Sequence, residues 1–220
     1  MKVQQAYTEW AATYDSDRNL TRDLDQQVMR DTFAHQRFGS VLEIGCGTGK
    51  NTALLAGIAG KVNAIDFSAA MIAKAKEKST FDNVTFTVAD ITERWPCPDA
   101  STDLVTCNLV LEHINDLSFI FSEATRVLNG GGQLFVSELH PFRQYLGVQA
   151  RFEHKQETTK IEAFVHHVTD FTDAARHHNL ILESMKEWQH EEDRDKPPRL
   201  ISFLFTRPEP EGLTQNRGAD

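Results

Sequence analysis

The chain has 220 residues, of which 40% are hydrophobic and 25% charged, a composition that suits one globular domain with a sizeable core. A formal net charge of −9 disfavours a nucleic-acid partner, because the phosphates would be repelled. Three scattered cysteines and the lack of a bilayer-length apolar run predict a cytoplasmic protein with no disulfide framework, zinc ribbon or membrane insertion.

The N-terminal segment, residues 1–38, predicts a helical cap made of two helices, over 3–14 and 21–36. Asn19 or Thr21 is suited to cap the second helix. Its apolar residues have the spacing of one buried stripe: Leu20, Leu24, Val28 and Phe33. That stripe packs either on this chain or on a second copy, so the sequence leaves a homodimer open.

Residues 41–49 read Val-Leu-Glu-Ile-Gly-Cys-Gly-Thr-Gly, a strand followed by three alternate glycines and a helical pattern. Gly45, Gly47 and Gly49 lack Cβ atoms, so a ligand can approach the backbone closely. The spacing does not fit the phosphate-binding Gly-x-x-x-x-Gly-Lys-Ser/Thr loop. It also departs from the dinucleotide pattern Gly-x-Gly-x-x-Gly, because the third glycine comes one residue early, which disfavours an NAD-dependent oxidoreductase.

Strand and helix patterns alternate after the glycines. In chain order we predict helix 49–59, strand 61–66, helix 69–79 capped by Ser68, strands 84–88 and 103–108, helix 116–128, strand 132–138, helix 169–179 capped by Thr169, and strands 181–188 and 200–206. The cluster from Asn129 to Gly132 is suited to end one helix and turn into the next strand. This order predicts an α/β, doubly wound, mostly parallel seven-stranded sheet with helices on both faces and an antiparallel C-terminal edge hairpin.

We expect one domain over residues 1–207 and a disordered polar tail over 208–220. Residues 139–168 show no clean period, and a long irregular insertion in a compact domain is often a lid. We therefore expect this insertion to cover an acceptor pocket.

Several further motifs accompany the glycine turn. They are Ile65-Asp66-Phe67-Ser68 with Met71, Val88-Ala89-Asp90-Ile91, the stretch 96–105, Asn108-Leu109-Val110-Leu111-Glu112-His113, and Val127 to Gly132. Over about residues 7–138 their order and spacing resemble the Rossmann-like (class I) S-adenosylmethionine-dependent methyltransferases, of the type that acts on small molecules. Glu43 suits a cationic sulfonium ligand better than a diphosphate, which it would repel.

The resemblance implies S-adenosylmethionine as the cofactor. The glycine turn would contact its methionine part, Asp66 its ribose, Asp90 and Ile91 its adenine, and the Asn108 backbone its α-amino group. The implied cofactor-binding residues are Tyr14, Glu43, Gly45, Cys46, Gly47, Gly49, Asp66, Phe67, Met71, Asp90, Ile91, Asn108, Leu109 and His113.

The acceptor side is less constrained by the sequence. His140 follows a predicted strand end and has a near-neutral intrinsic pKa, so we predict that it acts as a base or a positioning group. The predicted substrate-binding residues are Tyr7, Arg143, Tyr145, His166 and His167. We expect no metal, because the histidines lack a ligand spacing such as His-x-x-x-His.

These patterns predict a methyltransferase acting on an oxygen or nitrogen nucleophile of a small molecule that carries a carboxylate or other anionic group. Arg143 is the residue predicted to hold that anion. Residues 108–111 read Asn-Leu-Val-Leu. At this place, the family members that methylate planar amines of adenine or glutamine carry a motif similar to Asn/Asp-Pro-Pro-Tyr, so those substrates are disfavoured. The alternative is a non-catalytic S-adenosylmethionine-binding regulator or partner protein.

Overall fold

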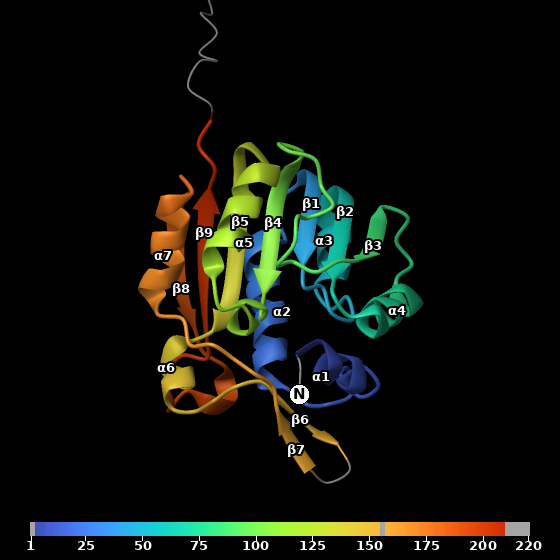
Figure 1. Cartoon of the computed structure of the whole chain (residues 1–220), viewed down its shortest axis with the longest axis vertical. Helices are drawn as coiled ribbons and strands as arrows, with labels where there is room; N and C mark the ends of the chain where they lie inside the picture. The colour runs from blue at the N-terminus through green and yellow to red at the C-terminus, as the bar shows by residue number, and fades with distance from the viewer. Residues whose placement is uncertain (1–2, 155–156, 210–220) are drawn as a thin grey trace, which may run out of the picture.

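The computed structural model describes residues 3–154 and 157–209, which form a seven-stranded sheet flanked by helices (Figure 1). The strand order is β3-β2-β1-β4-β5-β9-β8. Strands β1 to β5 pair in parallel, whereas β9 is antiparallel to both β5 and β8. The predicted doubly wound sheet and its C-terminal edge hairpin are therefore confirmed.

The helices are α1 (Val3–Trp10), α2 (Leu20–Phe33), α3 (Thr52–Ile58), α4 (Ala69–Lys78), α5 (Leu117–Val127), α6 (Pro141–Tyr145) and α7 (Val168–His177). The strands are β1 (Phe38–Ile44), β2 (Ala59–Asp66), β3 (Val84–Val88), β4 (Thr102–Asn108), β5 (Leu128–Leu139), β6 (Arg151–His154), β7 (Glu157–Lys160), β8 (Ile181–Trp188) and β9 (Leu200–Thr206). Two short 3₁₀ turns, η1 (Leu111–His113) and η2 (Glu191–Asp193), complete the described chain.

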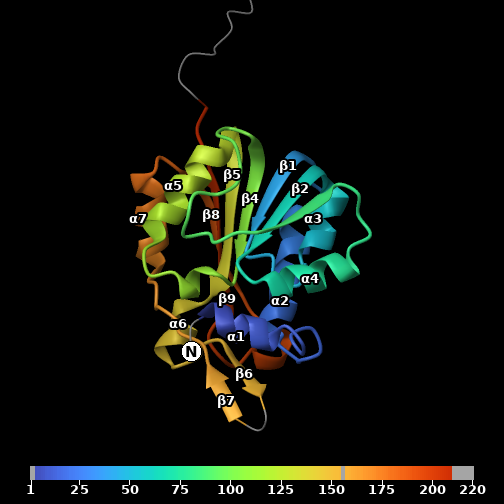
Figure 2. The ribbon, with the colours of Figure 1, turned by 45° about the vertical axis from the view of Figure 1, so that its right-hand side comes forward.

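The sheet has a buried core on each face. On one face Val28 of α2 and Leu55 of α3 pack against Val41 and Val62 of the sheet. On the other, α5 and α7 pack against β4, β5 and β9, with Phe121 among the residues that are fully buried. Figure 2 shows the two helical layers on opposite sides of the strands. The apolar stripe of α2 therefore packs on its own chain.

Several predicted ends and caps differ from the structure. The first helix ends at Trp10, where the indole N–H donates to the Asp17 carboxylate at 2.7 Å and the chain turns. The cluster 129–132 lies within the bounds of β5, where an irregularity interrupts the pairing with β4 between Leu128 and Gln133, and Asn129 donates to Asp103 of β4 at 2.7 Å. The N-cap of α7 is His167, not Thr169, because the His167 backbone N–H donates to the Asp170 carboxylate at 2.7 Å.

Residues 139–168 are more regular than predicted. They contain α6 and an antiparallel hairpin made of β6 and β7. In Figures 1 and 2 this hairpin and α1 lie beyond the carboxyl ends of the parallel strands. The same segment therefore lies at the end of the sheet where ligands bind in open α/β folds. Of the predicted tail, residues 210–220 lie outside the described residues.

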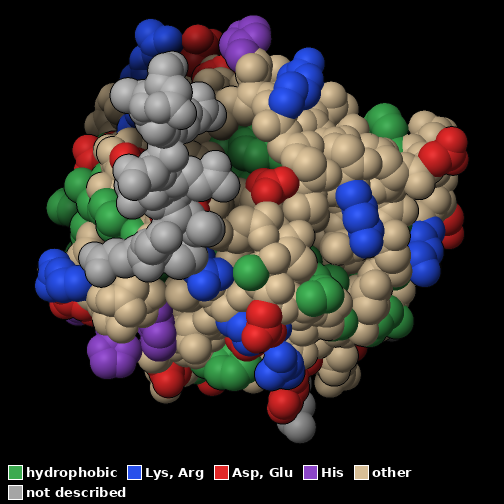
Figure 3. All heavy atoms as spheres, turned by 90° about the horizontal axis from the view of Figure 1, so that it is seen from above, with side chains coloured by type: hydrophobic (Ala, Val, Ile, Leu, Met, Phe, Trp, Pro, Cys, Tyr) green, Lys and Arg blue, Asp and Glu red, His purple; other side chains and the backbone are tan. Residues whose placement is uncertain are grey.

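Acidic and basic side chains are interspersed on the opposite end of the molecule, which Figure 3 shows from above. Among the described residues visible on that face, acidic side chains lie between the basic ones, unlike the continuous basic patch that binds nucleic acid. Within residues 3–154 and 157–209, none of the helices has the length and apolar character needed to cross a bilayer.

Candidate functional site

The glycine turn after β1 has a conformation that requires glycine. Gly45 has φ +68°, and a Cβ atom placed on it would lie 2.2 Å from Cγ2 of Val110. Leu109, beside it, also adopts a positive φ of 58° without being glycine. Positive φ in a leucine costs roughly 1–2 kcal/mol, and strain of this kind concentrates at functional sites.

Asp66, the last residue of β2, is fixed by two backbone groups. Its carboxylate accepts hydrogen bonds from the N–H of Gly47 at 2.9 Å and the N–H of Ser68 at 2.8 Å. Ser68 in turn caps α4 by accepting from the Met71 N–H, as predicted. Burial raises the pKa of Asp66 to about 6, although the two backbone hydrogen bonds oppose this shift. The ends of β1 and β2 are thereby joined around one carboxylate.

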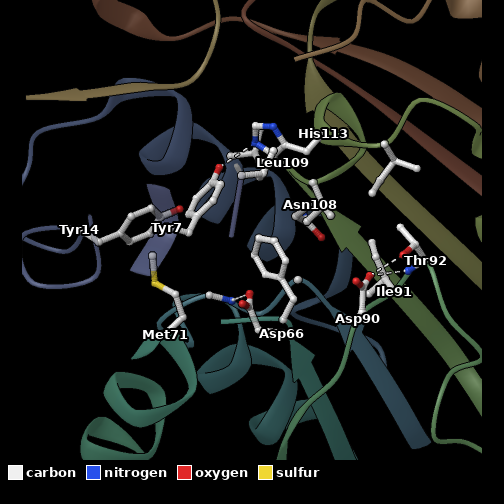
Figure 4. A pocket seen from close by; sticks show the side chains of 16 residues that line it. Tyr7, Tyr14, Asp66, Met71, Asp90, Ile91, Thr92, Asn108, Leu109 and His113 are labelled. Atoms are coloured by element: carbon white, nitrogen blue, oxygen red, sulfur yellow. Dashed lines mark hydrogen bonds between the residues drawn. The ribbon is translucent and has the colours of Figure 1, made fainter. Parts of the chain in front are cut away.

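A cavity opens beside this carboxylate (Figure 4). Its lining residues are Val3, Tyr7, Tyr14, Gly45, Gly47, Asp66, Phe67, Met71, Asp90, Ile91, Thr92, Asn108, Leu109, Val110, His113 and Ile114. Asp90 lies on the opposite side of this cofactor cavity from Met71 and is held by Thr92, whose N–H and hydroxyl donate to it at 2.9 and 2.7 Å. Most of the predicted cofactor-binding residues therefore surround one cavity.

A smaller recess continues from the cofactor cavity under the glycine turn. The two share Tyr14, Gly45, Gly47, Asn108 and Leu109. Two buried acids, Glu43 and Asp25, line this recess. Asp25 accepts from the side-chain amides of Asn108 and Asn51, each at 2.8 Å.

Both recess acids carry raised pKa values. Burial raises the pKa of Glu43 to about 8, against the opposing hydrogen bond from the Thr52 hydroxyl at 2.5 Å. Burial also raises the pKa of Asp25. With Asp66, these acids surround the glycine turn with carboxyl groups, and a bound cation would lower their pKa values and draw them into the ionised form.

Three predicted cofactor residues do not line the cofactor cavity: Glu43, Cys46 and Gly49. Glu43 and Cys46 line the recess, where Cys46 packs in a small cluster with Ala64 and Ile72. Gly49 faces α4, because a Cβ placed on it would lie 3.3 Å from the Cβ of Ala75. Gly49 thus allows the glycine turn and α4 to approach closely.

Helix α1 lies across the cofactor cavity and contacts Phe67 on one side and His113 on the other. The Gln4 amide donates to the Phe67 carbonyl at 2.8 Å, and the Tyr7 hydroxyl lies 2.9 Å from Nε2 of His113. The Tyr7 ring also lies near the rings of Trp10 and Phe67, with centroids 5.8 and 6.1 Å away. The N-terminal helix therefore supplies an aromatic cover.

A second, more polar cavity, here called the acceptor cavity, adjoins the cofactor cavity. The two share Tyr7, Tyr14 and Leu109. The other lining residues of the acceptor cavity are Trp10, Arg18, Asn19, Leu20, Thr21, Arg22, Glu112, Leu139, Leu146, Gly147, Val148, Gln149, Ala150, Lys160 and Arg199. Residues 146–150 and Lys160 belong to the predicted lid, so this insertion does form a wall.

Arg143 and His140, which the sequence predicted to act on the acceptor, lie outside both cavities. Arg143 is buried and pairs with Asp193 at 2.8 Å. His140 caps α6, accepting from the Phe142 N–H through Nδ1, while its Nε2 lies 3.0 Å from the Glu187 carboxylate.

The remaining predicted acceptor residues also serve local structure. His166 is buried and donates from Nε2 to the carbonyl of Ile114 at 2.7 Å. Tyr145 and His167 are both exposed and contact each other, with the hydroxyl 2.5 Å from Nδ1. Of the predicted substrate-binding residues, the structure brings only Tyr7 to the junction of the two cavities.

Sequence reasoning missed two charged residues of α2, Arg22 and Asp25. The Arg22 guanidinium lies over the Tyr14 ring at 4.0 Å and donates to the carbonyl oxygens of Tyr14 and Asp17. Arg22 lines both the acceptor cavity and the recess. The sequence did contain a signal for them, because Arg22 and Asp25 are oppositely charged, three residues apart, and lie next to the buried apolar stripe of an amphipathic helix.

Residues 42–136 match the protein family described as Methyltransferase domain. The chain is 32% identical over 137 residues to the malonyl-[acyl-carrier protein] O-methyltransferase of Yersinia pestis, covering 62% of this chain and 50% of that protein. It thus spans about half the length of the curated relatives it matches. The fold resembles a putative S-adenosylmethionine-dependent methyltransferase from Listeria monocytogenes (TM-score 0.73, 19% identity, 86% and 100% covered).

A second structural neighbour is the N-methyltransferase NodS from Bradyrhizobium japonicum, solved with S-adenosylhomocysteine (TM-score 0.72, 18% identity, 95% and 100% covered). Identities this low establish the fold alone. Together with the match over residues 42–136, they show that the chain has a Rossmann-like fold that contains a segment similar to methyltransferase domains.

Proposed function

We propose that this protein transfers a methyl group from S-adenosylmethionine to an oxygen or nitrogen nucleophile of a small molecule that carries an anionic group. The observation that carries the proposal is the junction of two cavities, which meet at Tyr7, Tyr14 and Leu109. The lining of the first includes Asp66 and Asp90, and that of the second includes Arg18, Arg22 and Arg199. Such a junction lets two different ligands approach each other away from bulk water.

The residues of the cofactor cavity and the recess fit S-adenosylmethionine. That cofactor supplies an electrophilic methyl group on a positively charged sulfur. Gly47 leaves its backbone accessible, because a Cβ placed on it would meet no other atom within 4 Å. Asp66 and the exposed Asp90 are suited to ribose hydroxyls and an adenine amine. A cation bound beside Glu43 and Asp25 would stabilise their ionised forms, whereas the diphosphate of NAD would gain no such stabilisation there.

More basic than acidic side chains line the acceptor cavity: Arg18, Arg22, Lys160 and Arg199 against Glu112. The Asp193 carboxylate is shared by Arg143 and Arg199, so one negative charge balances two guanidinium groups. Arg22 donates to backbone carbonyls, which carry no net charge. The first turn of α2, from Asn19 to Arg22, also lines the cavity and adds the positive end of a helix dipole. This excess of positive charge supports an anionic acceptor.

A small acceptor suits this site better than a carrier protein. Acyl-carrier proteins are large partners, whereas the cationic groups here line the cavity and the rim carries ion pairs such as Arg18 with Glu192. The name of the Yersinia pestis relative concerns a malonyl group, which carries a carboxylate. We extend to this chain only the anionic character of that group.

Calorimetric titration with S-adenosylmethionine, S-adenosylhomocysteine and NAD tests the cofactor assignment. We expect micromolar binding of the first two, weakened in Asp66→Ala, and no binding of NAD. Mass spectrometry of small carboxylic acids incubated with protein and S-adenosylmethionine then tests transfer. Binding without transfer to any acceptor would favour the non-catalytic regulator, and preference for NAD would overturn the proposal.

We also propose a reducing, cytoplasmic setting. Cys46, Cys97 and Cys107 are all buried free thiols. Burial raises the pKa of each, which keeps them as unreactive thiols.

A further inference from the structure

Tyr7 and His113 meet at the junction of the two cavities with a defined hydrogen-bond direction. The Tyr7 hydroxyl lies 2.9 Å from Nε2 of His113, and Nδ1 of His113 lies 2.7 Å from the carbonyl oxygen of Glu162. A carbonyl oxygen only accepts, so Nδ1 carries the hydrogen. Nε2 of the neutral ring then accepts from the Tyr7 hydroxyl (Figure 4).

The surroundings keep both rings neutral before reaction. Burial lowers the pKa of His113, so its ring is unprotonated near pH 7. Burial raises the pKa of Tyr7 well above its ordinary value, and the nearby Tyr14, Glu112, Asp66 and Glu138 add to this shift. Tyr7 therefore does not hold a phenolate charge, but its oxygen keeps lone pairs free to accept a hydrogen bond.

Glu112 is placed to stabilise a protonated His113. Its Oε1 lies 3.9 Å from Nε2 of His113, and both side chains are only 7% exposed. The other oxygen, Oε2, is buried and has no hydrogen-bond partner within the described part of the chain. Burial raises the pKa of Glu112 to about 7, so a positive charge on the ring would draw Glu112 into its ionised form.

We propose that Tyr7 and His113 form a proton relay for the acceptor, with Glu112 as its counter-charge, and that the acceptor nucleophile is a hydroxyl or amine. This inference rests on the proposed methyltransferase function. It goes beyond it by separating the anionic group of the acceptor from the atom that is methylated.

When Glu112 is ionised at the start, the relay accounts for every proton and charge. The acceptor atom forms its bond to the methyl carbon as the carbon–sulfur bond breaks and leaves its electron pair on sulfur. The proton of the acceptor atom passes to Oη of Tyr7 while the hydroxyl proton of Tyr7 passes to Nε2 of His113. The positive charge thus ends on the imidazole, beside Glu112. A carboxylate nucleophile carries no proton and would not need this relay.

The first test reads the hydrogen-bond direction without activity. Two-bond nitrogen–proton NMR spectra of the ¹⁵N-labelled full chain, recorded at pH 8 with S-adenosylhomocysteine, identify the His113 tautomer, and His113→Gln assigns the signal. We expect an unprotonated Nε2 whose shift changes in Tyr7→Phe. A proton on Nε2 at pH 8 would overturn the relay.

The second test measures single-turnover transfer from S-adenosylmethionine to 3-hydroxybenzoate, 3-aminobenzoate and the carboxylate of malonyl-N-acetylcysteamine. For a hydroxyl or amine, Tyr7→Phe and His113→Gln should slow transfer about 10²–10³-fold and remove the acidic limb of the rate profile, with cofactor Kd nearly unchanged. Wild-type rates in Tyr7→Phe, or transfer to the malonyl carboxylate alone, would overturn the proposal.

Ser118→Ala is the matched control. Its hydroxyl also lies 2.9 Å from Nε2 of a histidine, His178, but outside both cavities, so transfer rates should not change. If no acceptor is turned over although the cofactor binds, the NMR result decides. If the cofactor does not bind, the proposed function fails, and the tautomer of His113 in the free protein still tests the pair.

Discussion

The backbone N–H of Gly47 donates to Oδ2 of Asp66 across 2.9 Å, which links the glycine turn to the end of the neighbouring strand. The same carboxylate accepts from Ser68 at the start of α4. One buried acid thus holds both the glycine turn and the start of α4, and the same acid lines the cofactor cavity. Its protonation state should control both the shape of the turn and cofactor binding.

Cofactor affinity should therefore depend on pH through Asp66. The pKa of Asp66 is raised to about 6, and the bound cofactor favours the carboxylate because ribose hydroxyls donate to it. We expect the Kd for S-adenosylmethionine to fall as the pH rises from 5 to 7. In Asp66→Asn, binding should be roughly 10- to 100-fold weaker, corresponding to a charge-assisted hydrogen bond, and independent of pH. Calorimetry at four pH values checks this, and a parallel slope in Asp66→Asn would contradict it.

Glu43 should reduce stability as the pH rises. Its pKa is about 8 in the folded protein and about 4.5 when unfolded, so between these values the folded state holds a proton that the unfolded chain has released. The free energy of unfolding then decreases with pH by up to about 1.4 kcal/mol per pH unit. Glu43→Gln keeps an acceptor for the Thr52 hydroxyl and removes this pH-dependent contribution. In urea unfolding, its free energy of unfolding relative to that of the wild type should therefore increase from pH 5.5 to 7.5.

Glu123→Gln provides a control of opposite sign. Arg126 holds the pKa of Glu123 below its ordinary value, through hydrogen bonds of 2.6 and 2.7 Å. Its carboxylate therefore stabilises the fold above the unfolded pKa, and that contribution is lost as the pH falls through the folded pKa. Replacing it should destabilise the protein at neutral pH and have little effect at pH 3. Equal pH profiles for the two variants would refute the assignment for Glu43.

Gly45→Ala should disrupt the glycine turn. The new Cβ would lie 2.2 Å from Val110, and alanine would have to adopt a positive φ. The combined clash and strain should cost about 2–4 kcal/mol in urea unfolding. Gly57→Ala, within α3 and with nothing near its Cβ, should instead stabilise by about 0.5–1 kcal/mol. Adding Val110→Ala to Gly45→Ala should restore part of the loss, and no restoration would exclude the steric clash as its cause.

Arg199 should bind the anionic group of the acceptor. It lines the acceptor cavity, donates to Thr21, and its Nε–H has no acceptor within the described residues. With S-adenosylhomocysteine bound, malonate should bind wild type about 10- to 100-fold more tightly than Arg199→Gln in calorimetric titrations. Arg30→Gln, an exposed arginine of α2, serves as the control and should bind malonate as wild type does. Equal binding by Arg199→Gln would exclude this anion site.

Most of the residues that the sequence predicts for the cofactor line one cavity, because they lie at or near strand ends. In a parallel sheet the residues that end neighbouring strands meet at one edge, so Asp66 and Asn108 were placed by register alone. The glycine turn could also be predicted from the sequence, because the positive φ at Gly45 disfavours residues that have a side chain. Strand periodicity and the backbone conformation of a turn are both set by residues close together in the sequence.

The acceptor half was decided only by tertiary packing. Arg143 and His140 follow a strand end in the sequence, yet Asp193 and Glu187 from the C-terminal hairpin region pair with them outside the cavities. Arg22 and Tyr7 reach the junction because the N-terminal helices pack across the sheet edge. The sequence therefore determined the fold and the cofactor-facing edge through local conformation and strand order. The acceptor side depended on long-range pairings of side chains, whose partners no local pattern specifies.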